Sequence, residues 1–77
     1  MGKKHRRKTF PLTAVVHAAH VKMRLDQYLV AQGWVESRKR AQAVIMAKKV
    51  YVDGHPQTKA GVAVRAGQQV ELKGPDH

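Results

Sequence analysis

Residues 23–54, MRLDQYLVAQGWVESRKRAQAVIMAKKVYVDG, carry the strongest pattern in this sequence. Leu25, Tyr28 and Leu29 fall at i, i+3 and i+4, which predicts a short helix with one apolar face. Gly33 is expected to end this helix, because glycine adopts the left-handed conformation of a helix C-terminus without a Cβ penalty. The stretch therefore opens with a helix and a turn.

A second helix is expected after Ser37, whose hydroxyl can accept a hydrogen bond from a backbone N–H of the first turn. Ala41, Val44 and Ile45 repeat at i, i+3 and i+4 and mark its buried stripe. At about 100° per residue, three polar residues fall on a different face, within about 40° of each other. They are Arg38, Gln42 and Lys49.

Short strands are expected after the helices. Residues 50–52 alternate with period two, and Asp53-Gly54 favours an immediate reversal of the chain. Pro56 is expected to stop the strand, leaving a loop at residues 55–58. Residues 62–64 and 69–72 supply two further strands, which can cover one side of the helices. The predicted core contains Leu25, Leu29, Val44, Ile45, Val50, Val52, Val64, Val70 and Leu72.

Several short motifs follow one another in a fixed order within residues 23–73. They are Arg24-Leu25-Asp26, Ser37-Arg38, Ala41, Val44-Ile45 and Val50-Tyr51-Val52-Asp53-Gly54. As an ordered set they resemble the S-four RNA-binding domain, also called the alpha-L RNA-binding motif. The resemblance implies an α+β fold class, with two short helices packed on a small, mostly antiparallel sheet of three to four strands. It also implies an RNA-binding face made of Arg24, Ser37, Arg38, Gln42, Lys49, Tyr51, Asp53 and Lys59.

The charge balance independently favours a polyanionic partner. The 77 residues contain 15 Lys+Arg and 5 Asp+Glu, a formal net charge of +10. Such a field attracts nucleic acid first and an anionic membrane second. Arg38, Lys39 and Arg40 open the second helix, where the first backbone N–H groups also favour a phosphate. Lys48 and Lys49 end it, so both ends of this helix are candidates for phosphate contact.

Three residues allow a structural and a functional interpretation. Tyr51 lies between two valines that are expected to be buried, so its ring should point outward. It can stack on an unpaired base or pack against a lysine stem, and both interpretations stay open. Trp34 is expected to plug the small core rather than to stack on a base. Asp26 is expected to orient Arg24 or the first helix rather than to take part in catalysis.

Residues 1–22 are predicted to form a basic, flexible arm, ahead of a domain at residues 23–73 and a linker stub at residues 74–77. The cations of the arm are Lys3, Lys4, Arg6, Arg7 and Lys8, and they either contact RNA or stay solvated. Within it, residues 10–21 leave two interpretations open, a short helix capped by Thr13 or an extra edge strand through Val15 and Val16. His17 and His20 have no evident third ligand nearby, so a metal site is not expected.

The sequence shows no pattern typical of an enzyme. It lacks cysteine, which excludes a disulfide framework and a thiolate metal site. It also lacks a glycine-rich phosphate loop, a catalytic triad and a pair of neighbouring carboxylates for acid–base work. No apolar run approaches the roughly 18 residues of a membrane span. The chain is predicted to be a monomeric, cytoplasmic binding module without a cofactor of its own.

Further motifs are similar to the N-terminal head of the haemolysin-A-like (TlyA-like) ribosomal RNA 2′-O-methyltransferases. They are Tyr28-Leu29-Val30, Ala43-Val44-Ile45-Met46-Ala47, Lys59-Ala60-Gly61 and Lys73-Gly74-Pro75-Asp76-His77. The resemblance implies recognition of ribosomal RNA for an S-adenosylmethionine-dependent methyl transfer whose catalytic domain is absent from this chain. A stand-alone ribosome-associated factor is the alternative. A helix-turn-helix DNA-binding protein fits less well because strands follow at once, and a membrane-surface peptide fits least.

Overall fold

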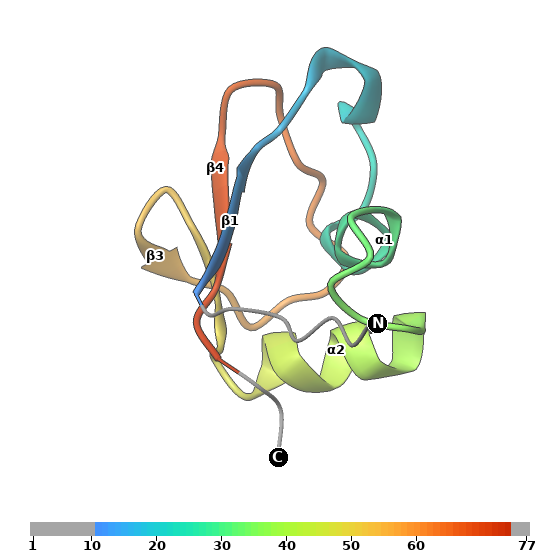
Figure 1. Ribbon diagram of the computed structural model, residues 1–77, viewed down its shortest axis with the longest axis vertical. Coiled ribbons are helices and arrows are strands. Elements are labelled where there is room, and N and C mark those ends of the chain that lie inside the picture. Colours follow the sequence, from blue (N-terminus) through green and yellow to red (C-terminus); the bar gives the residue numbers. More distant parts are fainter. Residues whose placement is uncertain (1–10, 75–77) are drawn as a thin grey trace, which may run out of the picture.

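The computed structural model describes residues 11–74, which form two helices and a sheet of four strands. In chain order the elements are β1 (Leu12–Val15), the 3-10 helix η1 (Ala18–His20), α1 (Leu25–Ala31), α2 (Arg38–Met46), β2 (Val50–Val52), β3 (His55–Pro56) and β4 (Gln69–Leu72). All neighbouring strands are antiparallel, in the order β1-β4-β2-β3. Figure 1 shows the sheet on one side and both helices on the other. The predicted α+β class is confirmed.

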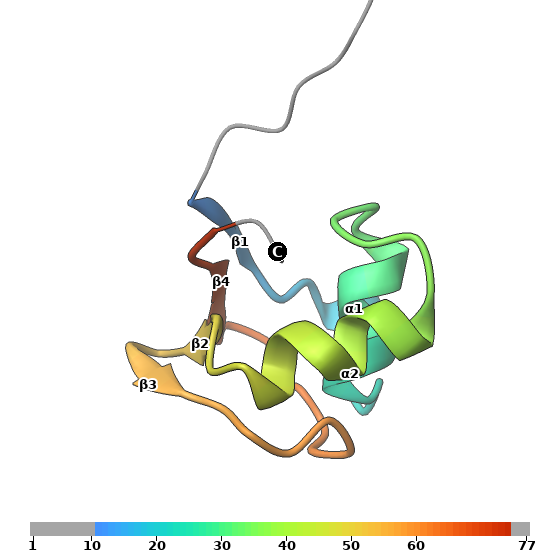
Figure 2. The same ribbon diagram turned by 90° about the horizontal axis from the view of Figure 1, so that it is seen from below.

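One hydrophobic core fills the space between the sheet and the helices. Figure 2 shows the arrangement of the sheet and the two helices from below. The sheet register places Val50 opposite Leu72 and Val52 opposite Val70, so these four side chains point toward the helices. Every core residue predicted from the sequence is buried. Three further side chains complete the cluster together with Ala41 of the predicted stripe: Val16, Tyr28 and Val35.

The N-terminal segment contributes an edge strand. β1 pairs with β4 along its whole length, from Leu12 opposite Leu72 to Val15 opposite Gln69. Val16 then enters the core at 3% exposure, and its N–H donates to the carbonyl of Gln68 at 2.8 Å. The expected edge strand is therefore confirmed, although it runs from Leu12 to Val15 and ends before Val16. A flexible arm as far as residue 22 is wrong. The predicted basic arm at residues 1–8 lies outside the described residues.

Both helix ends predicted from local chemistry are confirmed. Gly33 has φ 75°, and the N–H of Trp34 closes the end of α1 by donating to the carbonyl of Leu29 at 3.1 Å. Ser37 Oγ accepts a hydrogen bond from the N–H of Arg40 at 3.1 Å and caps α2. Within the described part of the chain, no helix is both long and apolar enough to span a membrane.

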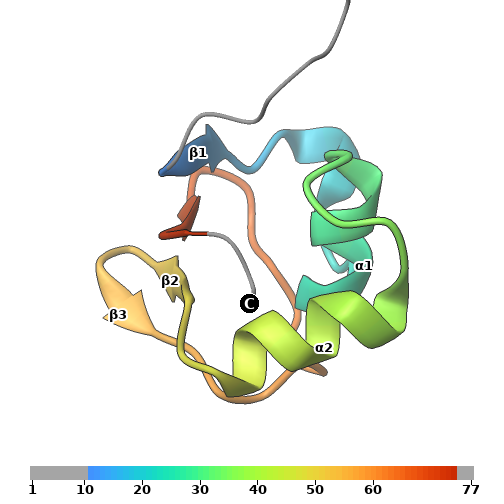
Figure 3. The same ribbon diagram turned by 60° about the horizontal axis from the view of Figure 1, so that its bottom comes forward.

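The segment after β3 differs from the prediction. Residues 62–64 form no strand but run extended beside the residues that precede α1. There the N–H of Leu25 donates to the carbonyl of Val62 at 2.8 Å, and the N–H of Val64 to that of Met23 at 2.9 Å. His55–Pro56, predicted as loop, instead forms β3, an edge strand in which a proline costs no ladder bond. Figure 3 shows how residues 57–64 run from the sheet to the start of α1.

Candidate nucleic-acid interface

A buried carboxylate lies at the centre of the predicted cationic face. The side chain of Asp26 has no solvent exposure. Its Oδ1 lies 3.2 Å from Arg24 Nε and accepts the N–H of Gln27 at 2.8 Å. Its Oδ2 accepts hydrogen bonds from Arg24 at 3.3 Å and from Gln42 Nε2 at 3.1 Å, with a guanidinium nitrogen of Arg38 at 3.7 Å. One carboxylate thus joins the start of α1 to the first turns of α2.

The surrounding donors keep this carboxylate ionised. Burial by itself would raise the pKa of Asp26, because it disfavours the charged form. Hydrogen bonds from Gln42, Arg24 and Gln27, together with the charge of Arg24, outweigh burial and hold the pKa below its ordinary value of 3.8. Asp26 thus contacts Arg24 and the first turn of α1, as expected of a residue that orients Arg24 or the first helix. We call the group Arg24, Asp26, Arg38 and Gln42 the Asp26 cluster.

The cluster presents positive charge to solvent. The side chains of Arg24 and Arg38 are 46% and 53% exposed, although both reach the same buried carboxylate. Each guanidinium has five N–H donors, so donors remain on both after the contacts with Asp26. These planar groups match two oxygens of a phosphate. The arrangement can therefore hold a phosphate backbone at the junction of α1 and α2.

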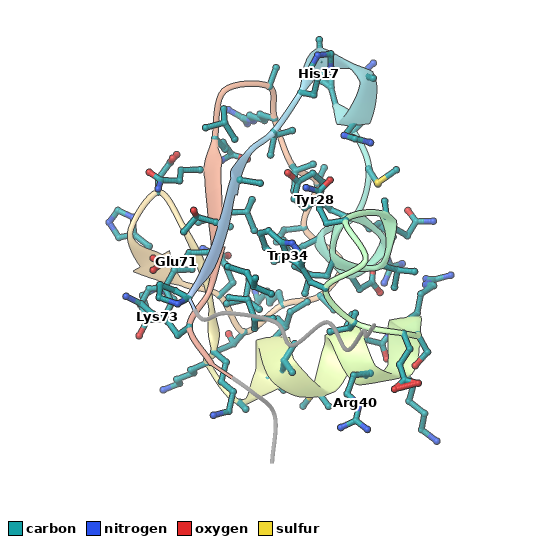
Figure 4. All side chains as sticks on the ribbon, viewed as in Figure 1. His17, Tyr28, Trp34, Arg40, Glu71 and Lys73 are labelled. Carbon is teal, nitrogen blue, oxygen red and sulfur yellow. The ribbon has the colours of Figure 1, made fainter. Side chains whose placement is uncertain are left out.

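The other cations at the start of α2 lie on a different flank of the helix. Two successive steps of about 100° place Arg38 and Arg40 roughly 160° apart around the axis. A shallow hollow on α2 is lined by Ser37, Lys39, Arg40 and Ala43. Figure 4 shows Arg40 pointing away from α1 and from the sheet. The three consecutive cations thus form two cationic surfaces that meet at the N-terminus of α2.

The two predicted lysines that follow α2 lie away from the Asp26 cluster. α2 ends at Met46, so Lys49 does not continue the helical face of Arg38 and Gln42 as predicted. Lys48 instead reverses the chain with φ 63°, and the carbonyl of Lys49 accepts the N–H of Lys73 at 2.7 Å beside the sheet.

Lys59, in contrast, is brought near the cluster by the fold. It is an exposed loop residue whose neighbour Ala60 accepts the N–H of Asp26 at 3.3 Å. Lys59 is therefore carried to the start of α1, and its charge adds to that of the cluster.

Tyr51 and Asp53 belong to the face of the sheet that points away from the helices. The register aligns Tyr51 with Glu71 of β4, and the Lys73 ammonium lies 4.8 Å from the Tyr51 ring centroid. Lys73 also pairs with Glu71 at 3.5 Å, and Figure 4 shows both on this outer side. Asp53 has φ 51°, and its Oδ1 accepts the N–H of Gln69 at 3.0 Å. The structure thus places a lysine against the Tyr51 ring and uses Asp53 in a turn.

Lys73 was missed as a candidate residue at this outer face. Alternation with period two along residues 69–73 places Glu71 and Lys73 on the same side as Tyr51, and this signal is readable in the sequence. Trp34 packs edge-to-face on Tyr28, with ring centroids 6.4 Å apart, and is half-buried against the core. Its predicted role as a plug is confirmed. Among residues 11–74, no group of three or more metal-ligating side chains is found.

Two comparisons with known proteins agree with this arrangement. A model of the S4 domain family matches residues 23–70, which include both helices, β2, β3 and the first half of β4 but not β1. Hemolysin A of Brachyspira hyodysenteriae is 36% identical over 50 residues, which are 65% of this chain and 21% of that protein. The chain therefore spans about a fifth of the length of this relative.

Proposed function

Because the chain belongs to the S4 domain family and is an RNA-binding module, we propose that it recognises ribosomal RNA as the head of a longer 2′-O-methyltransferase. The similarity to Hemolysin A over about a fifth of that protein supports a head attached to a larger whole. Its site of action would be the cytoplasm.

The observation that carries the RNA-binding surface is the Asp26 cluster. Arg24 immediately precedes α1 and Arg38 is the first residue of α2, and both keep about half of their side-chain surface in solvent. The N-terminus of α2 adds oriented backbone N–H groups next to Arg38. The proposed RNA surface consists of this cluster with Lys59, and of Ser37, Lys39 and Arg40 on the neighbouring flank of α2. Lys48 and Lys49 lie beside the sheet, and Tyr51 and Asp53 lie on its outer side, so these four predicted residues are not part of the same surface.

The methyl-transfer step would belong to another domain. S-adenosylmethionine would bind at the strand ends of a doubly wound α/β domain, which needs several βα units. Residues 11–74 are taken up by two helices and four antiparallel strands, and the S4 domain family model matches residues 23–70. The head would then supply affinity and placement on the RNA, and the second domain the chemistry.

The surface can be tested with one pair of arginine variants. Arg38→Ala should weaken binding to ribosomal RNA by about 1–3 kcal/mol, because it removes a charge-assisted contact to phosphate. Arg65→Ala, an exposed residue in the turn before β4, should cost less than about 0.5 kcal/mol. The measurement is a titration of both variants with structured RNA and with duplex DNA, alongside melting curves. Equal losses for both variants, or tighter binding to duplex DNA, would contradict the proposed surface.

Arg38→Ala also tests the link to methylation. The chain alone should not methylate ribosomal subunits in a labelled-methyl assay. Joined to the catalytic domain, it should support activity that falls with Arg38→Ala through weaker substrate binding. A catalytic domain that works equally well without this head would refute the recognition role. Measurable affinity of the isolated chain for S-adenosylmethionine would contradict the proposal that another domain binds this cofactor.

A further inference from the structure

Asp26 is an unexpected residue at the centre of an RNA-binding surface. It is the one charged side chain that is fully buried in the described part of the chain, and it lies directly beneath Arg24 and Arg38. A carboxylate repels the phosphates that the surface must attract. A buried ion pair is also weak evidence for stability, since desolvation offsets much of the Coulomb attraction. Neither overall charge nor stability therefore accounts for a carboxylate at this position.

The contacts of Asp26 instead fix the direction of two guanidinium groups. Arg24 meets the carboxylate through two nitrogens, at 3.2 and 3.3 Å, which sets both the position and the plane of the group. The backbone at Gly61 lies close to the Arg24 guanidinium. A Cβ added at Gly61 would lie 3.6 Å from the Nη2 atom of Arg24. Arg38, from the other helix, approaches the same Oδ2 at 3.7 Å. Two cations that would repel each other are thus held side by side.

The carboxylate is in turn held in place by groups that belong to both helices. The N–H of Gln27 in α1 donates to one oxygen, and the side-chain amide of Gln42 in α2 donates to the other. Neither of these donors is a cation, so they orient the carboxylate without competing for phosphate. A group fixed in this way can transmit its orientation to the arginines above it.

We propose that Asp26 is a positioning residue, which orients Arg24 and Arg38 so that their remaining N–H donors meet neighbouring phosphates of one RNA segment. The inference rests on the proposed RNA-binding function. Ordering a long side chain is a cost of binding, and a side chain that is already ordered in the free protein lowers that cost. Asp26 would therefore increase affinity for RNA even though its charge opposes it.

For Asp26→Asn, this proposal predicts weaker RNA binding, whereas net charge alone predicts tighter binding. Asp26→Asn makes the chain more positive by one charge, which would tighten binding if charge alone mattered. If Asp26 acts by positioning, Asp26→Asn should bind RNA about tenfold more weakly. In metal sites, removing a residue that orients a metal ligand by a hydrogen bond weakens metal binding by about 10- to 100-fold, and we expect the lower end of that range here. Glu36→Gln makes the same charge change at an exposed position just before α2, and it should bind as well as the wild type or better.

The experiment is a titration of the full chain with structured ribosomal RNA, at a temperature where circular dichroism shows every variant folded. In a background where Arg24 and Arg38 are both replaced by alanine, Asp26→Asn should no longer weaken binding. If the double alanine variant binds RNA as tightly as the wild type, the proposed function fails at this surface. If that variant binds weakly but Asp26→Asn matches Glu36→Gln, only the positioning role is refuted.

A measurement on the unmodified chain covers the case in which Asp26→Asn does not fold. Nitrogen-15 NMR should show slow rotation of the Arg24 guanidinium about its Nε–Cζ bond and slow exchange of its Nε–H with water. Arg65 provides the comparison, because it is exposed in a turn. Rotation and exchange as fast for Arg24 as for Arg65 would overturn the proposal.

Discussion

Asp26 couples the charge of a single residue to the packing of two helices. Its carboxylate accepts hydrogen bonds from α1 and α2 while it is excluded from water. The folded state lowers its pKa, and the unfolded chain, in which the residue is solvated, keeps the ordinary value of 3.8. Between the two pKa values the unfolded chain binds the proton more tightly. The stabilisation from Asp26 is therefore complete above the unfolded pKa and is lost as the pH falls through the folded one.

The first prediction concerns this acid dependence. Asp26→Asn should lower the free energy of unfolding at pH 7 by about 1–2 kcal/mol, because charge-assisted hydrogen bonds to half-exposed partners are lost. The difference from the wild type should stay constant down to about pH 4 and shrink below it. Urea unfolding between pH 2 and pH 7 measures this. The exposed variant Glu36→Gln is the control, and an equal shrinkage for it would show that Asp26 is not responsible.

The candidate site was predictable where local rules apply and unpredictable where distant residues meet. Helical periodicity placed Arg38 and Gln42 on one face, and both reach Asp26 in the structure. The same periodicity misplaced Lys49, because the helix stops at Met46. The contact between Asp26 and Gln42 spans 16 residues and depends on how α1 packs on α2, which no single periodicity encodes.

At the level of elements, the helix ends are set by local chemistry that can be read directly from the sequence. A serine cap and a glycine with positive φ satisfy backbone groups within a few residues of themselves, so both were predictable. The edge strands were harder to predict. β1 pairs with β4 across more than fifty residues of chain, and its four residues do not identify that partner. Residues 62–64 alternate as a strand should, yet their hydrogen bonds go to the residues around Arg24.

The glycine that ends α1 gives a prediction about this element. Gly33 has φ 75°, and a Cβ added there would meet no atom within 4 Å, so Gly33→Ala introduces backbone strain without a clash. We expect a loss of about 1 kcal/mol in the free energy of unfolding. Denaturant titration of both proteins measures it.

Gly61→Ala is the matched control for that substitution. Gly61 does not have a positive φ, and an added Cβ would make an ordinary contact of 3.6 Å with Arg24. Its stability should change by less than about 0.5 kcal/mol. Equal losses at the two glycines would show that the left-handed conformation of Gly33 is not the cause.

At the level of the whole molecule, the net charge of +10 and the sheet topology place different demands on the N-terminal segment. The first eight residues carry five cations, which favour contact with phosphates. Residues 12–16 carry no charge but complete the sheet and the core. The residues that add positive charge for RNA binding and the residues that stabilise the fold are therefore only a few positions apart along the chain.

Two truncations test that separation. Deleting residues 1–8 should leave the melting temperature nearly unchanged but lower the salt dependence of RNA binding by roughly two to three units, if about three phosphates are contacted. Deleting residues 1–16 should lower the melting temperature strongly, because it removes β1 and the buried side chain of Val16. Thermal melts and RNA titrations at several salt concentrations measure both effects. An unchanged salt dependence after the first deletion would show that these cations do not contact the RNA.

The pairing of Leu12 with Leu72 has a mechanical consequence. β1 and β4 are antiparallel, so the chain enters the fold and leaves it at the same end of the sheet. A force that pulls the two ends apart would load the hydrogen bonds between β1 and β4 one after another, as in opening a zipper, instead of loading all of them at once in shear. The domain should therefore open at low force under stretching in an optical trap, beginning with β1. Tension between the flanking parts of a longer chain would then act first on the strand that closes the sheet.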